Sequence, residues 1–165
     1  MFKVGDKVVH PTHGAGVVIS IESKDIIDEF DKYYVIDMVA SRMKLMVPVK
    51  NAEEIGLRRA IKRSRALRLL DILRGYPDEL PDDYRERQAR IAEKLKSGDA
   101  IAIAQVVRNL YWWDQQKKLS AGDTKLFDRA KQLLIGELAL AEDIEAEAAN
   151  KQLEAALAYR LKDRP

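Results

Sequence analysis

The chain has 165 residues, of which 47% are hydrophobic and 34% are charged, a composition typical of a globular protein rather than a disordered one. It contains no cysteine, which excludes disulfide bonds, a thiolate nucleophile and cysteine-bound zinc. No apolar run approaches the roughly 20 residues needed to cross a bilayer, and the N-terminus lacks the apolar core of a signal peptide. We therefore expect a cytoplasmic protein without membrane contact.

The formal net charge is only +2, but the charge is unevenly distributed. Residues 1–50 balance seven basic against seven acidic side chains, whereas residues 56–97 carry twelve basic and seven acidic ones. Within that second stretch, no acidic residue occurs from Arg58 up to Asp71. Basic charge gathered in this way indicates either a polyanionic partner or a solvated helix face.

The first 50 residues follow the two-residue period of β-strands. The runs are rich in β-branched and aromatic residues and are separated by turn-forming residues; they cover residues 7–10, 16–22, 33–39 and 43–49. Gly14 and Gly16 are expected to supply a tight turn and a bend, and Pro48 indicates that the last strand lies at an edge or ends there. Four or five short strands in this length predict a small, strongly bent β-barrel.

After residue 50 the period changes to that of α-helices. Helices are predicted around Leu67–Leu73, after a cap at Asp82 or Asp83, from Asp99, from a capping box at Ser120 and Asp123, and over roughly residues 143–161. The predicted fold class is therefore α+β. A β-barrel domain over residues 1–52 precedes an all-α helical domain over residues 53–165.

Enzymatic motifs are absent from the sequence. The two histidines, His10 and His13, fall in a turn without the spacing that gathers further metal ligands. There is no phosphate-binding Gly-x-x-x-x-Gly-Lys stretch and no Gly-x-Ser-x-Gly nucleophile elbow. We predict a protein that is not an enzyme and has no cofactor or metal.

The start of the helix after Pro81 has the character of a nucleic-acid site. Tyr84 lies in its first turn, and three basic side chains follow it: Arg85, Arg87 and Arg90. Arginines near first-turn amides suit phosphate, and an exposed aromatic ring can lie against a base or enter a distorted minor groove. The alternative is that Tyr84 packs inside the bundle with Ile91 and Leu95 while the arginines are solvated.

The two tryptophans call for different interpretations. Trp113 falls on the apolar stripe of Val106 and Leu110, which favours core packing. Trp112 falls on the other side of that helix, where it forms either a contact surface or packing against a neighbouring helix or the β module.

Several stretches resemble the CarD/CdnL family of bacterial transcription regulators. The opening FKVGDKVVHPTHGAGVV, residues 2–18, strongly resembles the start of these proteins, whose N-terminal module is shared with the transcription-repair coupling factor. The resemblance continues through residues 47–49, 55–58, 95–99, 106–110, 119–123 and 134–142. It covers roughly residues 1–142, and residues 143–165 add little.

The resemblance implies a Tudor-like N-terminal barrel that binds the RNA polymerase β subunit. It also implies a helical domain that contacts promoter DNA, without sequence specificity, at the upstream edge of the transcription bubble. In such proteins a tryptophan wedges into the minor groove and slows collapse of the open complex. The matching position here is Tyr84, which we expect to act as a wedge.

The resemblance also implies contact residues. Arg87 matches a basic position that contacts DNA, and Arg85 and Arg90 are expected to compensate for basic positions that are not basic here. On the barrel, Lys24 and Met46 match polymerase-contacting positions that can be arginine in relatives.

Together with Arg42 and Lys44, those two barrel residues are the expected polymerase-binding surface of a monomeric protein. A protein–protein scaffold that does not bind DNA is the alternative function, and an RNA-associated SH3-like module is a third possibility.

Overall fold

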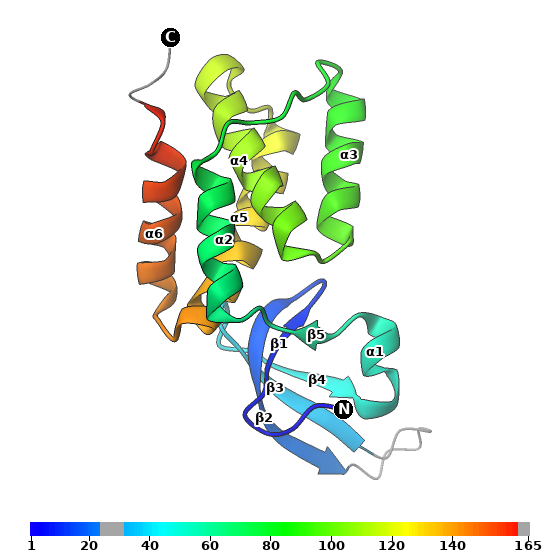
Figure 1. Ribbon diagram of the computed structural model, residues 1–165. Helices are drawn as coiled ribbons and strands as arrows, with labels where there is room; N and C mark the ends of the chain where they lie inside the picture. The colour runs from blue at the N-terminus through cyan, green and yellow to red at the C-terminus, as the bar shows by residue number, and fades with distance from the viewer. Residues whose placement is uncertain (24–31, 162–165) are drawn as a thin grey trace.

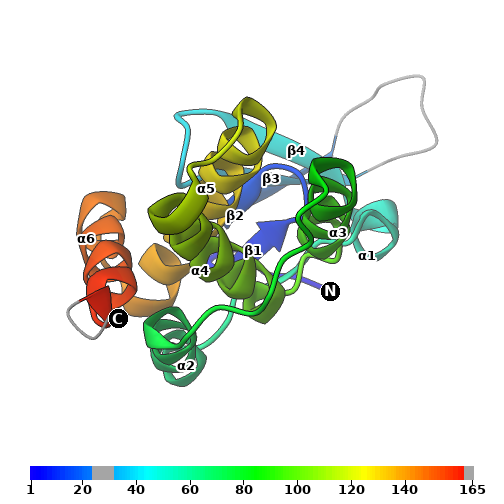
Figure 2. The same ribbon diagram turned by 90° about the horizontal axis from the view of Figure 1, so that it is seen from above.

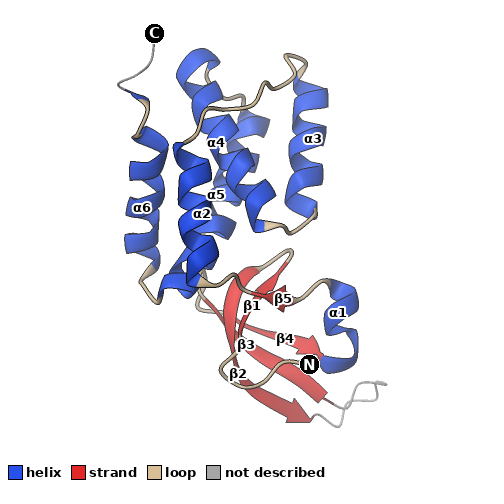
Figure 3. Ribbon diagram, viewed as in Figure 1, coloured by secondary structure: helices blue, strands red, loops and turns tan. Residues whose placement is uncertain are grey.

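The protein consists of a bent β-sheet with a helical bundle stacked on one side of it (Figures 1 and 3). The structure is a computed structural model that describes residues 1–23 and 32–161. The predicted α+β class, with a small β module preceding an all-α region, is confirmed. No helix among the described residues is long and apolar enough to cross a bilayer.

Five antiparallel strands form a single sheet in the order β4-β3-β2-β1-β5. The strands are β1 (Lys7–His10), β2 (Gly14–Ser23), β3 (Lys32–Met38), β4 (Lys44–Pro48) and β5 (Arg58–Arg59). β4 is an edge strand that ends at Pro48, as the position of that proline predicts. β4 therefore has one side free of ladder partners in the described sheet.

Two glycines and a bulge bend the sheet. Gly14, with φ +86°, makes the turn from β1 to β2 in a conformation that favours glycine. At Gly16 a Cβ atom would lie 2.5 Å from Ile36 Cγ2 and 2.7 Å from the Asp37 carbonyl oxygen, so only glycine fits against β3. The register between β2 and β3 then shifts between Val18 and Ser20. The turn and the bend predicted for these glycines are both present.

The sheet module continues beyond residue 52, where the sequence analysis places its end. A 3-10 turn (Val49–Asn51) and the short helix α1 (Ala52–Ile55) return the chain to β5, which pairs with Val8 and Val9 of β1. The amide of Ala60 then donates to the Lys7 carbonyl at 2.9 Å. The joint between the modules therefore follows residue 60, because the backbone of residues 58–60 completes the ladder of β1.

The helical domain contains α2 (Arg63–Arg74), α3 (Tyr84–Lys96), α4 (Ala100–Lys117), α5 (Ala121–Glu142) and α6 (Ala146–Ala158). The capping box of Ser120 and Asp123 at the start of α5 is present. The last helix is shorter than the predicted 143–161. Asp143, with φ +54°, ends α5, and a new helix begins after Glu145.

α4 lies at the centre of the bundle and contacts α2, α3 and α5. In both views α3 and α6 lie on opposite sides of α4 (Figures 1 and 2). One apolar core joins the helices and includes the fully buried side chains of Leu73, Leu110, Leu138 and Leu153. Burial of such side chains stabilises the bundle by about 1.5–3 kcal/mol each.

The bundle meets the sheet through α5 and β2. At Gly136 of α5 a Cβ atom would lie 3.3 Å from the Ala15 Cβ, so the helix and the strand pack closely there. Leu140 packs beside Val9 and Ala15 in a small apolar cluster between the modules. The two modules are therefore joined by packed side chains as well as by the chain connection.

Candidate nucleic-acid and protein interfaces

Tyr84 is the first residue of α3 and lies at the end of the bundle farthest from the sheet. Residues 75–83 cross that end from α2 to α3, so α3 begins there and runs back toward the sheet (Figure 1). Tyr84 is 52% exposed, whereas Ile91 and Leu95 of the same helix are buried. The alternative in which Tyr84 packs inside the bundle with these two residues is wrong, because the ring projects from the first turn of the helix.

Arg85 lies against the exposed ring. Its guanidinium carbon is 5.6 Å from the Tyr84 ring centroid, and its Nε donates a hydrogen bond to the Tyr84 hydroxyl at 3.1 Å. Asp83 caps the helix by accepting from the Glu86 amide at 3.1 Å. The cap and the arginine together restrict where the ring can point.

The surface charge around Tyr84 is nearly balanced. Arg90 forms an ion pair with Glu86 one turn away at 2.7 Å, and both side chains are exposed. Asp82 pairs with Lys117 at 2.7 Å, and the hydrogen bond and charge of Lys117 lower the pKa of Asp82. This end of α3 therefore lacks the strong positive field that the run of arginines suggests.

Arg87 is buried, which removes it from the surface that we expect DNA to touch. It is 4% exposed, and its guanidinium bonds both carboxylate oxygens of Asp123, at 3.1 and 2.8 Å. The remaining amino group donates to the backbone carbonyls of Pro81 and Asp82. The sequence places Arg87 in a basic run, but its position three residues into α3 turns it inward toward α5.

This buried pair fixes the start of α3. Burial by itself raises the pKa of Asp123, but hydrogen bonds from Arg87 and Ser120 outweigh it and lower the pKa, so the carboxylate stays charged. Arg87 thereby ties α3 both to the capping box of α5 and to the loop that precedes α3. It therefore holds the backbone where α3 begins, at Tyr84, without reaching the surface itself.

Trp112, and not Trp113 as the apolar stripe predicts, is the buried tryptophan. Trp112 is 5% exposed, because the connection after α2 covers this side of α4 and brings Tyr76 within 6.5 Å of it. This is the packing alternative rather than the contact surface. Trp113 is only half-buried, with Arg87 at 4.5 Å and Lys117 at 4.7 Å from its ring centroid.

The expected polymerase-binding residues lie on and beside the edge strand β4. Lys44 and Met46 alternate with the inward-facing Leu45 and Val47, and both are exposed. Arg42 is exposed in the preceding turn. Lys24 lies outside the described residues. Three of the four expected side chains thus lie on β4 or in the turn before it, and β4 belongs to the sheet module, away from the end of the bundle where α3 begins (Figure 1).

The histidines hold a turn. The Nδ1 atom of His10 accepts from the amides of Thr12 and His13 at 3.0 and 3.1 Å, and burial beside His13 lowers the pKa of His10. Over residues 1–23 and 32–161 no three His, Cys, Asp or Glu side chains gather in a way that could hold a metal ion.

Each module contains a match to a known domain family. Residues 2–61, which end just after β5, match the CarD-like/TRCF RID domain, and residues 68–154 match the CarD C-terminal domain. The "Putative transcription factor YdeB" of Bacillus subtilis (strain 168) is 31% identical over 144 residues, which are 87% of this chain and 94% of that protein. The chain belongs to the CarD family.

Membership in the CarD family makes the chain a CarD-like transcription factor whose sheet module is an RNA polymerase-interacting domain. CarD-family transcription factors are non-enzymatic, in agreement with the missing catalytic motifs. The assignment does not support the RNA-associated SH3-like module considered from the strand pattern.

An ion pair that the sequence did not predict joins the two modules of this CarD-family chain. Arg58 donates to both carboxylate oxygens of Glu137 at 2.7 and 2.8 Å and to the Gly98 carbonyl at 3.0 and 2.8 Å. Burial by itself lowers the pKa of Arg58, but Glu137 outweighs it and raises the pKa. Arg58 and Glu137 both fall in stretches that resemble the family, and this resemblance is the one sequence feature that marks them. Their spacing in the sequence does not predict that they form an ion pair.

Proposed function

We propose that this CarD-family protein docks on the β subunit of RNA polymerase through the β4 edge and stabilises the promoter open complex through Tyr84. Arg42, Lys44 and Met46 would contact the polymerase. The start of α3 would lie against DNA at the upstream edge of the bubble, with the Tyr84 ring in the minor groove and Arg85 and Arg90 near phosphates.

The observation that carries this proposal is the exposed Tyr84 ring on a fixed support. Tyr84 is 52% exposed at the end of the bundle, while Arg87, three residues further along α3, is 4% exposed and bonded to Asp123. An aromatic side chain held in place loses less conformational entropy on binding than a mobile one. Such a ring is suited to insertion between base pairs that are already partly unstacked.

The balanced charge near Tyr84 supports a DNA contact that depends on polymerase docking. Phosphate contacts supply most sequence-independent affinity for DNA, and here Arg90 and Lys117 are already engaged with Glu86 and Asp82. Tethering raises the effective concentration of a weak binding surface near its target. The β4 edge would provide the tether, and the packed joint would set the distance to Tyr84.

The chain would then act by shifting a population rather than by catalysing a step. A ligand that binds the open complex better than the closed one favours the open complex by its difference in binding free energy. A difference of about 1.4 kcal/mol changes the open-to-closed ratio about tenfold. No base-specific contact is needed for this effect.

The proposal is tested by the lifetime of open complexes formed by RNA polymerase on one promoter without the chain, with the chain, and with its Met46→Glu variant. We expect the chain to lengthen the lifetime, and the variant to lose both polymerase binding and the effect. A lifetime that does not change with the wild-type chain on several promoters would contradict the proposal.

The alternative of a scaffold that does not bind DNA is supported by the same balanced charge, and salt dependence separates it from our proposal. Binding of the chain to forked DNA should weaken as salt rises if phosphates are contacted. Affinity that is undetectable or independent of salt, together with intact polymerase binding, would favour the scaffold.

A further inference from the structure

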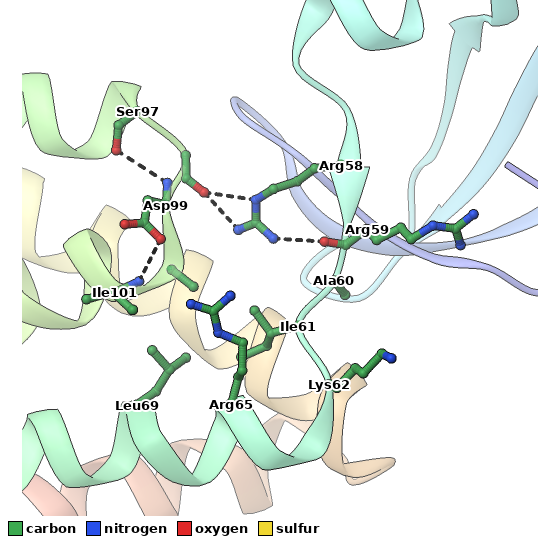
Figure 4. A pocket seen from close by; sticks show the side chains of 12 residues that line it. Arg58, Arg59, Ala60, Ile61, Lys62, Arg65, Leu69, Ser97, Asp99 and Ile101 are labelled. Carbon is green, nitrogen blue, oxygen red and sulfur yellow. Dashed lines mark hydrogen bonds between the residues drawn. The ribbon is translucent and has the colours of Figure 1, made fainter. Parts of the chain in front are cut away.

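A cavity of about 500 Å³ lies at the joint between the sheet module and the helical domain (Figure 4). Its walls are residues 58–62, the start of α2, and the turn from α3 into α4 at residues 97–101. The volume is within the range of small-molecule sites, which commonly occur between domains. The DNA and polymerase surfaces proposed above do not include any of its lining residues.

Apolar side chains line one part of the cavity, and a cation without an acidic partner points into it. Ile61, Leu69 and Ile101 provide the apolar part. The Arg65 guanidinium extends from α2 into the cavity toward the turn that carries Asp99 (Figure 4). Within the described residues Arg65 makes no ion pair or side-chain hydrogen bond, and the same is true of Lys62 at the edge of the cavity.

The other charged side chains of the cavity are already engaged. The Arg58 guanidinium donates to Glu137 and to backbone carbonyls, so Arg58 lines the cavity but is not available to a ligand. Arg59 is turned away and pairs with Asp6 at 3.0 Å. Asp99 caps α4 by accepting from the Ile101 amide at 3.2 Å with one carboxylate oxygen. The side chains available to a ligand are thus two cations, an apolar wall and one carboxylate.

We propose that this cavity binds a nucleotide. The planar base would lie against Ile61, Leu69 and Ile101, the phosphates would be held by Arg65 and Lys62, and Asp99 would accept hydrogen bonds from ribose hydroxyls or a base amine. A guanidinium matches phosphate oxygens with two parallel donors. Asp99 disfavours a bare anion at this place, so a ligand with both phosphate and hydroxyl groups fits better than phosphate alone.

The shape of the site favours a free nucleotide over the backbone of a nucleic acid. Backbone contacts need cations that reach the phosphates, but they need no apolar wall. Arg65 and Lys62 are themselves exposed, and what distinguishes them is the apolar wall of Ile61 and Ile101 beside them, with the buried Leu69 behind it. Arg63 and Arg68 of the same helix are also exposed but lie outside the cavity, and Arg74 pairs with Asp71.

An occupied cavity would join the two modules. Its ligand would contact the connection between β5 and α2 on one side and the start of α4 on the other. A ligand that binds only the assembled joint stabilises it in proportion to ligand concentration. Nucleotide binding would therefore strengthen the link between the sheet module and the helical domain.

The test is equilibrium binding of ADP and GDP to the full chain by calorimetry, with inorganic phosphate as a separate probe. We expect at least one nucleotide to bind more tightly than phosphate. Arg65→Ala should weaken that binding at least tenfold, and the matched control Arg68→Ala, on the same helix but outside the cavity, should leave it within twofold. The nucleotide should also raise the melting temperature of the wild type and of the control, but not of Arg65→Ala.

Three results would overturn the proposal. The first is no nucleotide binding at millimolar concentration, and the second is equal weakening by Arg65→Ala and Arg68→Ala, which would indicate general attraction to a basic helix. The third is a short DNA duplex whose own binding depends on Arg65 and that displaces the nucleotide, which would assign the cation to nucleic acid.

Discussion

An arginine–carboxylate ion pair lies at each end of the helical domain. Near the sheet, Arg58 meets Glu137, which is 2% exposed; at the far end Arg87 meets Asp123, which is 0% exposed. In both pairs the arginine lies at the start of an element and also bonds backbone carbonyls of a connecting loop. Each pair therefore fixes a connection as well as a helix.

The two ion pairs differ in the parts of the molecule that surround them. The Arg58–Glu137 pair lies between two modules and forms a joint, whereas the Arg87–Asp123 pair holds the first turn of α3, which begins at the exposed Tyr84. A buried ion pair adds little net stability but is expensive to break, because the remaining charge has no partner. The same chemistry thus orients two modules at one end and presents an aromatic ring at the other.

The largest expected effect is at the joint. Glu137→Ala leaves the Arg58 side chain, which is 31% exposed, without its carboxylate and the Ile61 amide without its acceptor. We expect a loss of about 3–4 kcal/mol in unfolding free energy, measured by urea titration, because water partly solvates Arg58 while the unpaired amide adds to the cost. The control Glu154→Ala removes an exposed carboxylate on α6, 3.8 Å from Lys131, and should change stability by less than about 1 kcal/mol. Equal losses of unfolding free energy in the two variants would contradict the prediction that the Arg58–Glu137 pair stabilises the joint.

Breaking the remote pair should have a slightly smaller effect. Arg87→Ala leaves Asp123 with bonds from Ser120, so we expect a loss near the low end of the range for buried pairs, about 3 kcal/mol, in the same titration. If the variant instead keeps its stability and loses only its effect on promoter DNA, then Arg87 contacts DNA and its positioning role is wrong.

The remote pair should also make stability depend on pH. The pKa of Asp123 is lower in the folded chain than its ordinary value. Its contribution is therefore complete above the unfolded pKa of about 3.9 and is lost as pH falls through the lowered folded pKa. Urea titrations at pH 7 and pH 3 should show a smaller drop in unfolding free energy for Asp123→Asn than for the wild type. An equal drop in both would assign the acid sensitivity to other carboxylates.

The smallest expected effect is at the exposed pair on the same helix. Arg90 and Glu86 lie on the surface at 2.7 Å, so Arg90→Ala should change unfolding free energy by no more than about 0.5 kcal/mol. If Arg90 contacts a phosphate, the salt dependence of forked-DNA binding should decrease by about one counterion. A stability loss as large as that of Arg87→Ala would contradict the distinction between buried and exposed arginines.

Local sequence patterns predicted the elements but not the pairs between them. The two-residue period, the glycines at 14 and 16 and the capping box at Ser120 depend on neighbouring residues, and the structure contains all of them. Whether Arg87 or Arg85 faces outward depends on the position of Asp123, 36 residues further along the chain. The burial of Trp112 likewise depends on a loop from another part of the sequence. Charge counts alone therefore could not separate contact residues from structural ones.

The most direct test of the account is the half-life of the open complex with Tyr84→Ala, at saturating chain and with polymerase binding measured in parallel. We expect the half-life to fall toward its value without the chain, while polymerase affinity and unfolding free energy stay unchanged because the ring is exposed. Tyr84→Trp, which keeps an aromatic ring, should retain the effect or increase it. A half-life with Tyr84→Ala equal to that of the wild type on several promoters would contradict the central role of this ring.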